Sequence, residues 1–349
     1  MNVFRLVLAS ALTLAVAQTH AQDNQALIYQ EGEEHEAIIN QSGTANYADV
    51  KQLQGWNDTA SINQVGDQNR AAAVQNGVDN FMESLQTGSA NVASVLQSGS
   101  LFTASIGQEG HANEAAISQG FLNNKAQVVQ LGDQQFAEVR QEGSTHDAFT
   151  RQQGVGNSVV VEQGGYYGGK WAFVEQSGTD HEAAVYQPSG GDNSATIYQY
   201  GSLHSAEITQ TLGEFLMGEN DAFIQQEEGT GSTGRIEQDY SKNIGGIIQF
   251  GDEHFASITQ SGESQTVLIS QDGWLNDGLS SQMGDANDVL IEQNGERNLA
   301  QVSQAGSQLE AVINQTGADH QAFITQGLAG NQAIITQLGM ANLATISQP

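Results

Sequence analysis

A period of eleven residues runs through the chain. Within its 349 residues a Gln recurs at 29 positions from Gln30 to Gln348, and 23 of the 28 steps between them are eleven residues long. The residue two before this Gln is Ile or Val in 25 units, and the residue four before it is Ala in 22 units. Ala37, Ile39, Gln41 and Gly43 form one such unit. A fixed short period means that one small structural unit is repeated along the chain.

The spacing inside the unit predicts a β-strand followed by a turn. Ala, Ile or Val, and Gln are separated by two residues, so they point to one face of a strand while the residues between them point to the other. The Gly that follows, with Asn or His three residues later, supplies the positive φ and the side-chain hydrogen bonds of a tight corner. Each unit is therefore expected to form a strand of about five residues plus a turn.

One such strand is not stable alone, and stacking must supply the stability. Two units make a coil of 22 residues with one strand in each of two facing sheets. The sequence thus predicts an all-β, amyloid-like β-solenoid of about 14 stacked coils, a rod about 70 Å long. Stacking places Ile on Ile, Gln on Gln and Asn on Asn in ladders. The candidate ladder residues are Ile28, Gln30, Ile39, Gln41, Asn46, Ile62, Gln64, Asn69, Ile335, Gln337, Asn342, Ile346 and Gln348.

Composition narrows the function classes. The chain has 10 Lys and Arg against 40 Asp and Glu, 40 Gly and no Cys. Few large apolar residues and a net charge of −30 are typical of disordered chains, and it is the period that points to order instead. Such a charge repels nucleic acid and anionic lipid. Without Cys, neither a disulfide framework nor a thiolate metal site is available.

The first 21 residues differ from the rest. Arg5 precedes an apolar run from Leu6 to Val16, and Thr19-His20-Ala21 is a plausible cleavage site, a pattern that predicts a secretory signal peptide over 1–21. The run is too short to span a bilayer comfortably, and no later segment is long and apolar enough to form a transmembrane helix. We therefore expect a secreted chain without a transmembrane segment.

The spacing also divides the remainder. Regular arms are expected over 22–163 and 246–349, with irregular repeats carrying corner insertions over 164–245, where four of the five longer steps fall. The insertions near 164–171 and 212–220 are interpreted either as a hinge or sticky loop or as additions that a solenoid corner tolerates.

Tandem units such as Ile62-Asn63-Gln64-Val65-Gly66-Asp67-Gln68-Asn69, placed after a signal peptide, resemble the curlin repeats of curli fibre subunits, the secreted functional amyloid of Gram-negative biofilms. The resemblance covers about residues 25–348 and includes more repeats than the curlins it resembles. It implies a β-solenoid whose inward ladders template other subunits. It further implies that the partners are copies of the chain itself, other curlin subunits and outer-membrane secretion machinery, and that the site of action is the cell surface or a fimbrium.

The histidines and the carboxylates near the turns are the candidate chemical sites of the sequence. Six His residues occupy the position otherwise filled by Asn, and His181 and His204 are expected to stack about 5 Å apart on one corner. They are either turn residues or a pair that titrates together or binds a metal weakly. Carboxylates just after Gly are either solubility charges or Ca²⁺ ligands; they are Asp67, Asp133, Asp252, Asp285 and Glu296. No catalytic motif is present, so we expect no enzyme, cofactor or metal site.

The terminal units suggest a function. Solenoids usually end in atypical polar caps, but Ala26–Gln30 and Ala344–Gln348 both follow the consensus. The leading hypothesis is a structural subunit that adds to copies of itself, with acid near about pH 4 or salt speeding assembly by reducing charge repulsion. The alternatives are a monomeric surface adhesin that binds ice or glycans, and a minor nucleator of curli fibres.

Overall fold

The computed structural model describes residues 23–165, 168–211 and 219–349, which form 29 strands and no helix. The strands belong to two sheets that alternate along the chain. The first sheet, here sheet A, holds β1 (Gln25–Glu33), β3 (Tyr47–Trp56), β5 (Arg70–Val78), β7 (Val92–Ser100), β9 (Glu114–Leu122), β11 (Phe136–Ser144), β13 (Ser158–Gly165), β15 (Glu182–Gln187), β17 (Ser205–Thr211), β19 (Thr233–Ser241), β21 (Phe255–Glu263), β23 (Asp277–Asp285), β25 (Leu299–Ser307), β27 (Gln321–Ala329) and β29 (Leu343–Gln348).

Sheet B holds the even-numbered strands: β2 (Glu36–Ser42), β4 (Thr59–Asp67), β6 (Phe81–Ser89), β8 (Thr103–His111), β10 (Lys125–Asp133), β12 (Asp147–Val155), β14 (Trp171–Thr179), β16 (Ser194–Ser202), β18 (Asp221–Glu227), β20 (Ile244–Asp252), β22 (Thr266–Trp274), β24 (Asp288–Glu296), β26 (Glu310–Ala318) and β28 (Gln332–Met340).

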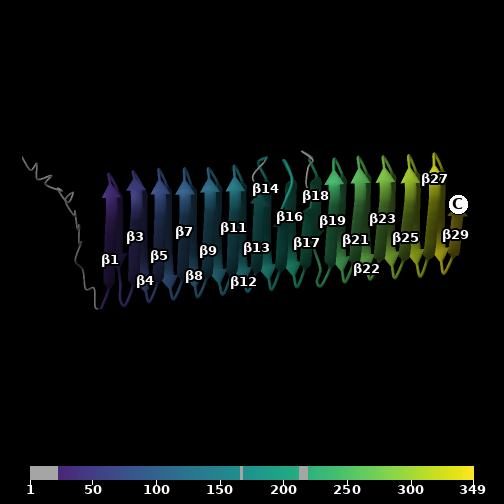
Figure 1. Cartoon of the computed structure of the whole chain (residues 1–349). Coiled ribbons are helices and arrows are strands. Elements are labelled where there is room, and N and C mark those ends of the chain that lie inside the picture. The colour runs from purple at the N-terminus through teal and green to yellow at the C-terminus, as the bar shows by residue number, and fades with distance from the viewer. Residues whose placement is uncertain (1–22, 166–167, 212–218) are drawn as a thin grey trace, which may run out of the picture.

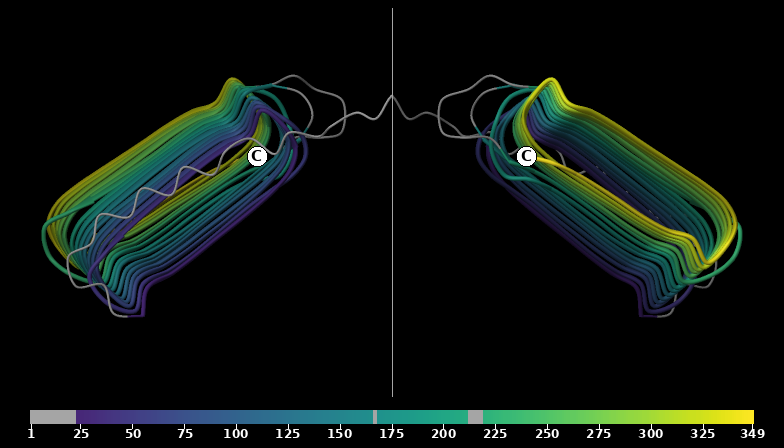
Figure 2. Two further views of the ribbon diagram at one scale, coloured as in Figure 1. Left: turned by 90° about the vertical axis from the view of Figure 1, so that its left-hand side faces the viewer. Right: turned by 90° about the vertical axis from the view of Figure 1, so that its right-hand side faces the viewer.

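The sheets form a rod, with β1 at one end and β29 at the other (Figure 1). Seen along the axis, the coils superpose as a flattened loop with two long straight sides, one for each sheet (Figure 2). All neighbouring strands pair in parallel, and equivalent positions of successive coils pair with each other: Gln130 lies between Gln108 and Gln152. The β-solenoid of about 14 two-strand coils predicted from the sequence is thereby confirmed.

The core lies between the two sheets and consists of columns of small and branched side chains. Ala60 and Ile62 of β4 are fully buried, as are Ala48 and Val50 of β3 on the facing sheet. Alternation with period two turns every second residue inward, and Ala opposite Ile or Val lets the sheets approach closely. The core therefore continues from coil to coil along the rod.

The strands are longer than the five residues expected from the sequence. Most of them span nine residues. The extension includes the Gly that lies two residues after Gln in most units and stays in the ladder: Gly110 pairs with Gly132. At Gly110 φ is +123°, and a Cβ would lie 2.0 Å from the carbonyl oxygen of Gly132. Phe121 and Leu328 take the equivalent position in two other units, also at positive φ. The chain turns two residues after the Gly, at Ala112, which adopts a left-handed conformation with φ of 56°.

The longer units keep the ladder in register by accommodating their extra residues in a bulge or between strands. The extra residue after Gln52 produces a register shift between Leu53 and Gly55. In 164–245, the additional residues fall between strands, and pairing resumes with Ala over Ala and Gln over Gln. Residues 166–167 and 212–218 lie outside the described part, so the interpretation of those loops as a hinge or sticky surface stays a prediction, as does the division into two arms and a middle.

The signal-peptide prediction falls on residues 1–21, which also lie outside the described part. Among the residues that are described, no helix is long and apolar enough to cross a membrane.

Candidate functional site: side-chain ladders and the two rod ends

Two unbroken columns of glutamine side chains run along the interior. In each column the Nε2 of one Gln donates to the Oε1 of the Gln one coil further on, at 2.7 Å from Gln30 to Gln52 and 2.9 Å from Gln41 to Gln64. The sheet A column ends with the bond from Gln326 to Gln348. All these bonds point the same way along the rod, so each column has a donor end and an acceptor end.

Most of these Gln side chains also tie the two sheets together. The second N–H of the Gln64 side chain donates to the carbonyl oxygen of Tyr47, seventeen residues earlier on the facing sheet, at 3.0 Å. The same bond recurs from Gln86 to the carbonyl oxygen of Arg70 at 2.9 Å. Because these amides are buried, an unmade bond would leave a desolvated polar group at a cost of about 1–3 kcal/mol. This explains why no other residue replaces the Gln in any of the 29 units.

A second pair of ladders runs along the two corners, through the residue immediately before each strand, here the corner slot. In slots occupied by Asn, the Oδ1 accepts the backbone N–H of the slot residue in the next coil, as from Asn69 to Asn46 at 3.0 Å. The Nδ2 donates to the carbonyl oxygen of a Gly in the next coil, as from Asn69 to Gly88 at 3.0 Å. The slot side chains thus bond coil to coil in one direction, as the Gln columns do.

The structure places the candidate ladder residues in these columns. Ile62, Gln64 and Asn69, from interior coils, are fully buried. Their equivalents in the terminal coils differ: Gln30 and Asn342 are exposed, whereas Ile28, Gln41 and Ile346 are half-buried. At the β28 end of sheet B, Ile335 and Gln337 remain buried, each 5 % exposed. Within the described residues, the ladder columns are therefore partly uncovered at β1, β2 and β29.

The two rod ends carry complementary hydrogen-bonding groups. Within the described residues, the Oε1 atoms of Gln30 and Gln41 accept no bond at the β1–β2 end. At the β28–β29 end the Nε2 of Gln337 makes its cross-sheet bond to Gln321, and the Nε2 of Gln348 makes its own to Gln332. Neither has a further Gln to donate to. Donor groups thus remain at one end and acceptor groups at the other.

The corner histidines are part of the slot ladder. The rings of His181 and His204 stack with centroids 5.2 Å apart, as the spacing predicted. The backbone N–H of His204 donates to Nδ1 of His181 at 3.3 Å, and the N–H of Ser232 donates to Nδ1 of His204 at 3.2 Å. Their Nε2 atoms lie 3.3 and 3.2 Å from the carbonyl oxygens of Ser177 and Tyr200. An acceptor Nδ1 requires the neutral ring with its proton on Nε2.

Burial lowers the pKa of both rings. The pKa of His204 falls to about 4, chiefly through burial and secondarily through the neighbouring His181. The pKa of His181 is also lowered, again mainly by burial. The pair is thus held neutral, as its hydrogen bonds require. Among the described residues, no group of three or more His, Asp or Glu side chains is arranged to hold a metal ion.

Two other slots hold buried groups that can carry charge. Burial lowers the pKa of Lys170 to about 8, and its Nζ donates to the carbonyl oxygen of Gly190 at 2.8 Å. Burial raises the pKa of Asp58, whose Oδ1 accepts the backbone N–H of Asn80 at 3.0 Å. Both replace Asn in the ladder and keep one of its hydrogen bonds.

Four of the five turn carboxylates considered as Ca²⁺ ligands have a local structural role. Each accepts a backbone N–H of the preceding coil, as Asp67 does from Thr44 at 3.0 Å and Asp252 from Thr230 at 2.8 Å. The same contact is made by Asp133 and Asp285. Glu296 lies instead 3.5 Å from Arg297. The four Asp carboxylates thus each accept a hydrogen bond from a corner amide of the adjacent coil.

Sequence reasoning missed a row of aromatic side chains on the outer face of sheet B. Tyr186 and Tyr198 are on opposite sheets, and Tyr198 contacts Phe173 and Phe223 of neighbouring coils at 5.4 and 6.1 Å between ring centroids. Comparing outward residues of every second unit, instead of successive units, would have revealed this row.

Comparison with known proteins identifies the repeat. Four segments match the sequence model of the curlin-associated repeat: 21–53, 172–201, 189–211 and 295–327. They lie near both ends and in the middle of the rod, and the strands between them follow the same ladder. No curated protein matches the chain. The solenoid is built throughout from one repeated unit that matches the curlin-associated repeat in four places, which supports its assignment as a curlin-repeat protein.

Proposed function

We propose that the chain is a secreted structural subunit that adds end to end to copies of itself and forms curli-like amyloid fibres of a biofilm matrix, where it serves adhesion and surface colonisation. The proposed partners are other copies, other curlin subunits and outer-membrane secretion machinery, and the proposed location is the cell surface or a fimbrium after removal of residues 1–21. The observation that carries this proposal is the pair of terminal coils, whose exposed columns continue those of the interior.

The chemistry of the ends favours head-to-tail addition. Nε2 donors of Gln337 and Gln348 would meet Oε1 acceptors of Gln30 and Gln41, which extends the columns across the junction. Addition of this kind also extends two parallel sheets with parallel strands. Contact between two like ends would pair strands antiparallel and set donors against donors or acceptors against acceptors, leaving amides unsatisfied.

The energetic gain at a junction comes from burial as well as from hydrogen bonds. Ile28, Ile39 and Ile346 are only half-buried in the single chain, whereas interior Ile residues are fully buried. Covering the apolar surface contributes about 25 cal/mol per Å². The described strands at each end also have one edge without a partner, and an uncovered parallel edge is a template for another strand.

The test compares two single substitutions in the last strand. Ile346 points into the core and Ser347 points outward, so Ile346→Lys places a charge in the proposed junction while Ser347→Lys adds the same charge beside it. The purified chain lacking residues 1–21 should form fibres by electron microscopy, with thioflavin binding and a fibre reflection near 4.7–4.8 Å. Ser347→Lys should do the same and Ile346→Lys should stay monomeric. A wild-type chain that stays monomeric would support the adhesin alternative instead.

The nucleator alternative predicts different stoichiometry. A nucleator accelerates fibres of another curlin when added in trace amounts, whereas a bulk subunit makes up most of the fibre mass. Seeding a second curlin with trace chain, and then quantifying the composition of the fibres, separates these roles.

A further inference from the structure

The outer face of sheet B carries four aromatic rings in a continuous row. Phe149, Phe173, Tyr198 and Phe223 come from β12, β14, β16 and β18, and we refer to them as the aromatic strip. Successive ring centroids are 5.2, 5.4 and 6.1 Å apart, and the first two rings are stacked with an interplanar angle of 14°. The strip therefore contains one ring from each of four successive coils, and the row runs parallel to the rod axis.

The strip follows from the register of the sheet. Phe149 and Phe173 are direct partners in the ladder, so their rings lie one above the other. In the next coil Thr196 takes the equivalent position, and the row continues through Tyr198, two residues further along the same strand. The rings are half-buried, because each leans on its neighbours and keeps one side open to solvent.

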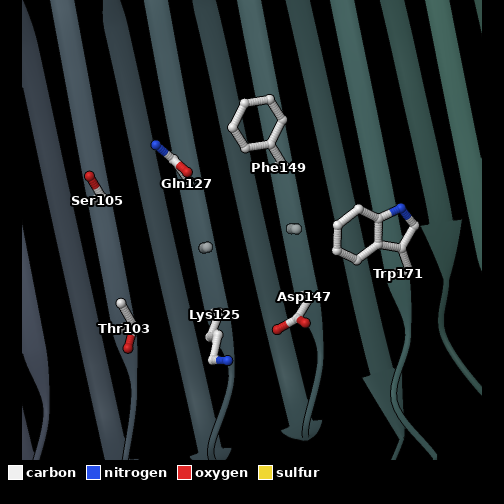
Figure 3. Close-up of a pocket in the computed structure, with 9 residues that line it drawn as sticks. Thr103, Ser105, Lys125, Gln127, Asp147, Phe149 and Trp171 are labelled. Carbon is white, nitrogen blue, oxygen red and sulfur yellow. The ribbon is translucent and has the colours of Figure 1, made fainter.

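A hollow of about 270 Å³ lies on the same face, beside the first ring of the strip. Phe149 and Trp171 line one side, and Lys125, Gln127 and Asp147 contribute polar side chains from adjacent strands (Figure 3). Two hydroxyl side chains of β8 complete the lining. The ring of Trp171 is 45 % exposed. An aromatic wall with a few polar groups of both kinds, donor and acceptor, is the usual make-up of a site for a small polar ligand.

The charges around the hollow balance, although the chain carries a net charge of −30. Lys125 and Arg151 are the two basic residues on the strands of sheet B, and both lie in this region. The guanidinium of Arg151 lies 3.7 Å from the carboxylate of Glu175, and Lys125 pairs in the ladder with Asp147. The site is thus locally neutral on an acidic rod, which favours an uncharged ligand and disfavours nucleic acid and anionic polymers.

We propose that the aromatic strip and the hollow bind an extended, neutral, β-linked hexose polymer laid along the rod axis. The flat C–H faces of the sugars would stack on the rings, with successive rings offered at the coil spacing, and sugar hydroxyls would hydrogen-bond to Lys125, Gln127 and Asp147. The site lies on a flat face away from both rod ends, so this binding does not depend on fibre formation.

The test uses cellohexaose in solution and regenerated cellulose as a solid phase. A triple variant removes the strip by Phe149→Thr, Phe173→Thr and Tyr198→Thr, since Thr196 shows that this face accepts Thr and Thr suits a strand. The matched control removes three outward rings of sheet A by Tyr186→Thr, Phe255→Thr and Phe323→Thr. Circular dichroism and fibre formation are measured for both variants, which keeps loss of fold or assembly separate from loss of binding.

The expected result is that the strip variant loses at least about tenfold in affinity for both probes, while the control variant binds as the wild type does. Unchanged binding by the strip variant, or equal loss in the control, overturns the proposal. So does the finding that the strip instead joins rods side by side, seen as lateral pairing that the strip variant abolishes while cellulose binding persists. None of these results bears on end-to-end assembly.

A second measurement avoids dependence on the triple variant. With Trp56→Phe and Trp274→Phe, Trp171 is the remaining Trp. Cellohexaose should then change its fluorescence saturably, and cellobiose should do so more weakly because it covers fewer rings. A flat titration contradicts the proposal even if the triple variant does not fold.

Discussion

The imidazole rings of His181 and His204 lie one coil apart with their planes within 5° of parallel, and the Nδ1 of the first accepts the backbone N–H of the second. The ladder therefore depends on a neutral ring. Protonation at Nδ1 would replace an acceptor with a donor facing another donor and add charge to a buried column that also holds His254.

Acid is expected to destabilise the rod through these rings. A pKa lowered in the folded state means that the unfolded chain binds protons first, so the stability from the neutral ring is complete above about pH 6.5 and declines as the pH falls toward about 4. His204→Asn, which restores the commonest slot residue, should flatten this decline. The measurement is the urea midpoint at about pH 7.5 and about pH 5. Ser232→Asn, which changes the same corner column without removing a histidine, should leave the pH dependence as in the wild type.

Salt should speed assembly. The chain has 40 acidic residues, and end-to-end addition brings like charges together, so screening lowers the barrier to contact. The lag time before thioflavin fluorescence rises should shorten between about 10 mM and about 300 mM NaCl. An unchanged lag would contradict the electrostatic argument. Acid should also speed assembly by reducing the charge repulsion, but it destabilises the rod by protonating the buried histidines. The His204→Asn variant is therefore the better background for measuring the effect of acid on assembly, because it has one buried histidine fewer.

Head-to-tail polarity predicts a defined heterodimer. Ile28→Lys blocks one end of the rod and Ile346→Lys blocks the other, so each variant alone should be monomeric. Mixed in equal amounts, they should form a one-to-one dimer through the two intact ends and stop there. Sedimentation velocity measures the masses. Dimers of either variant alone would show that like ends associate, and Tyr29→Lys with Ser347→Lys provides the outward-facing control pair.

The side chain of Thr150 occupies a position in the Ile and Val column and is fully buried, and its Oγ1 has no hydrogen-bond partner among the described residues. Thr150→Val removes this hydroxyl at nearly constant shape and should raise the free energy of unfolding by about 1–2 kcal/mol. Thr266→Val, on the exposed face of β22, should change it by less than about 0.5 kcal/mol. Chemical denaturation of soluble monomer, in the Ile346→Lys background, supplies the values.

Gly66 shows how closely successive coils approach. Its φ is +114°, and a Cβ would lie 2.0 Å from the carbonyl oxygen of Gly88. Gly66→Ala should lower the free energy of unfolding by at least about 2 kcal/mol in the same denaturation assay. Gly107→Ala serves as the control, because nothing lies within 4 Å of its Cβ position. This substitution should raise the free energy of unfolding by up to about 1 kcal/mol. Equal effects at the two positions would contradict the close-approach explanation.

The fold was predictable because its determinants recur in the sequence. The spacing of Ala, Ile and Gln predicted the strands, the stacking of like residues and the Gln columns, and the position of His181 and His204 predicted their ring contact. Strand length was not predictable from the inward face alone, since the Gly at positive φ remains in the ladder. The bond from the Gln64 side chain to the carbonyl of Tyr47 depends on the distance between the sheets, which the period does not specify.

The aromatic strip escaped prediction for a different reason. Outward residues have no period, so Phe149 and Phe173 meet only because an insertion at the intervening corner leaves the register intact. The proposal that residues such as Gln30 and Gln348 join the Gln columns of two chains likewise stays a prediction, because the structure contains one chain.

The parallel register also has a mechanical consequence. The backbone hydrogen bonds lie along the rod, and the covalent chain passes from one coil to the next only through a corner. Under tension a terminal coil can peel away while the rest stays intact, and its 22 residues then extend to about 70 Å in place of about 5 Å of rod. A filament of such rods would lengthen in steps and absorb mechanical work before any peptide bond breaks. When the load is removed, each released coil could pair again with the strands of the intact coil next to it.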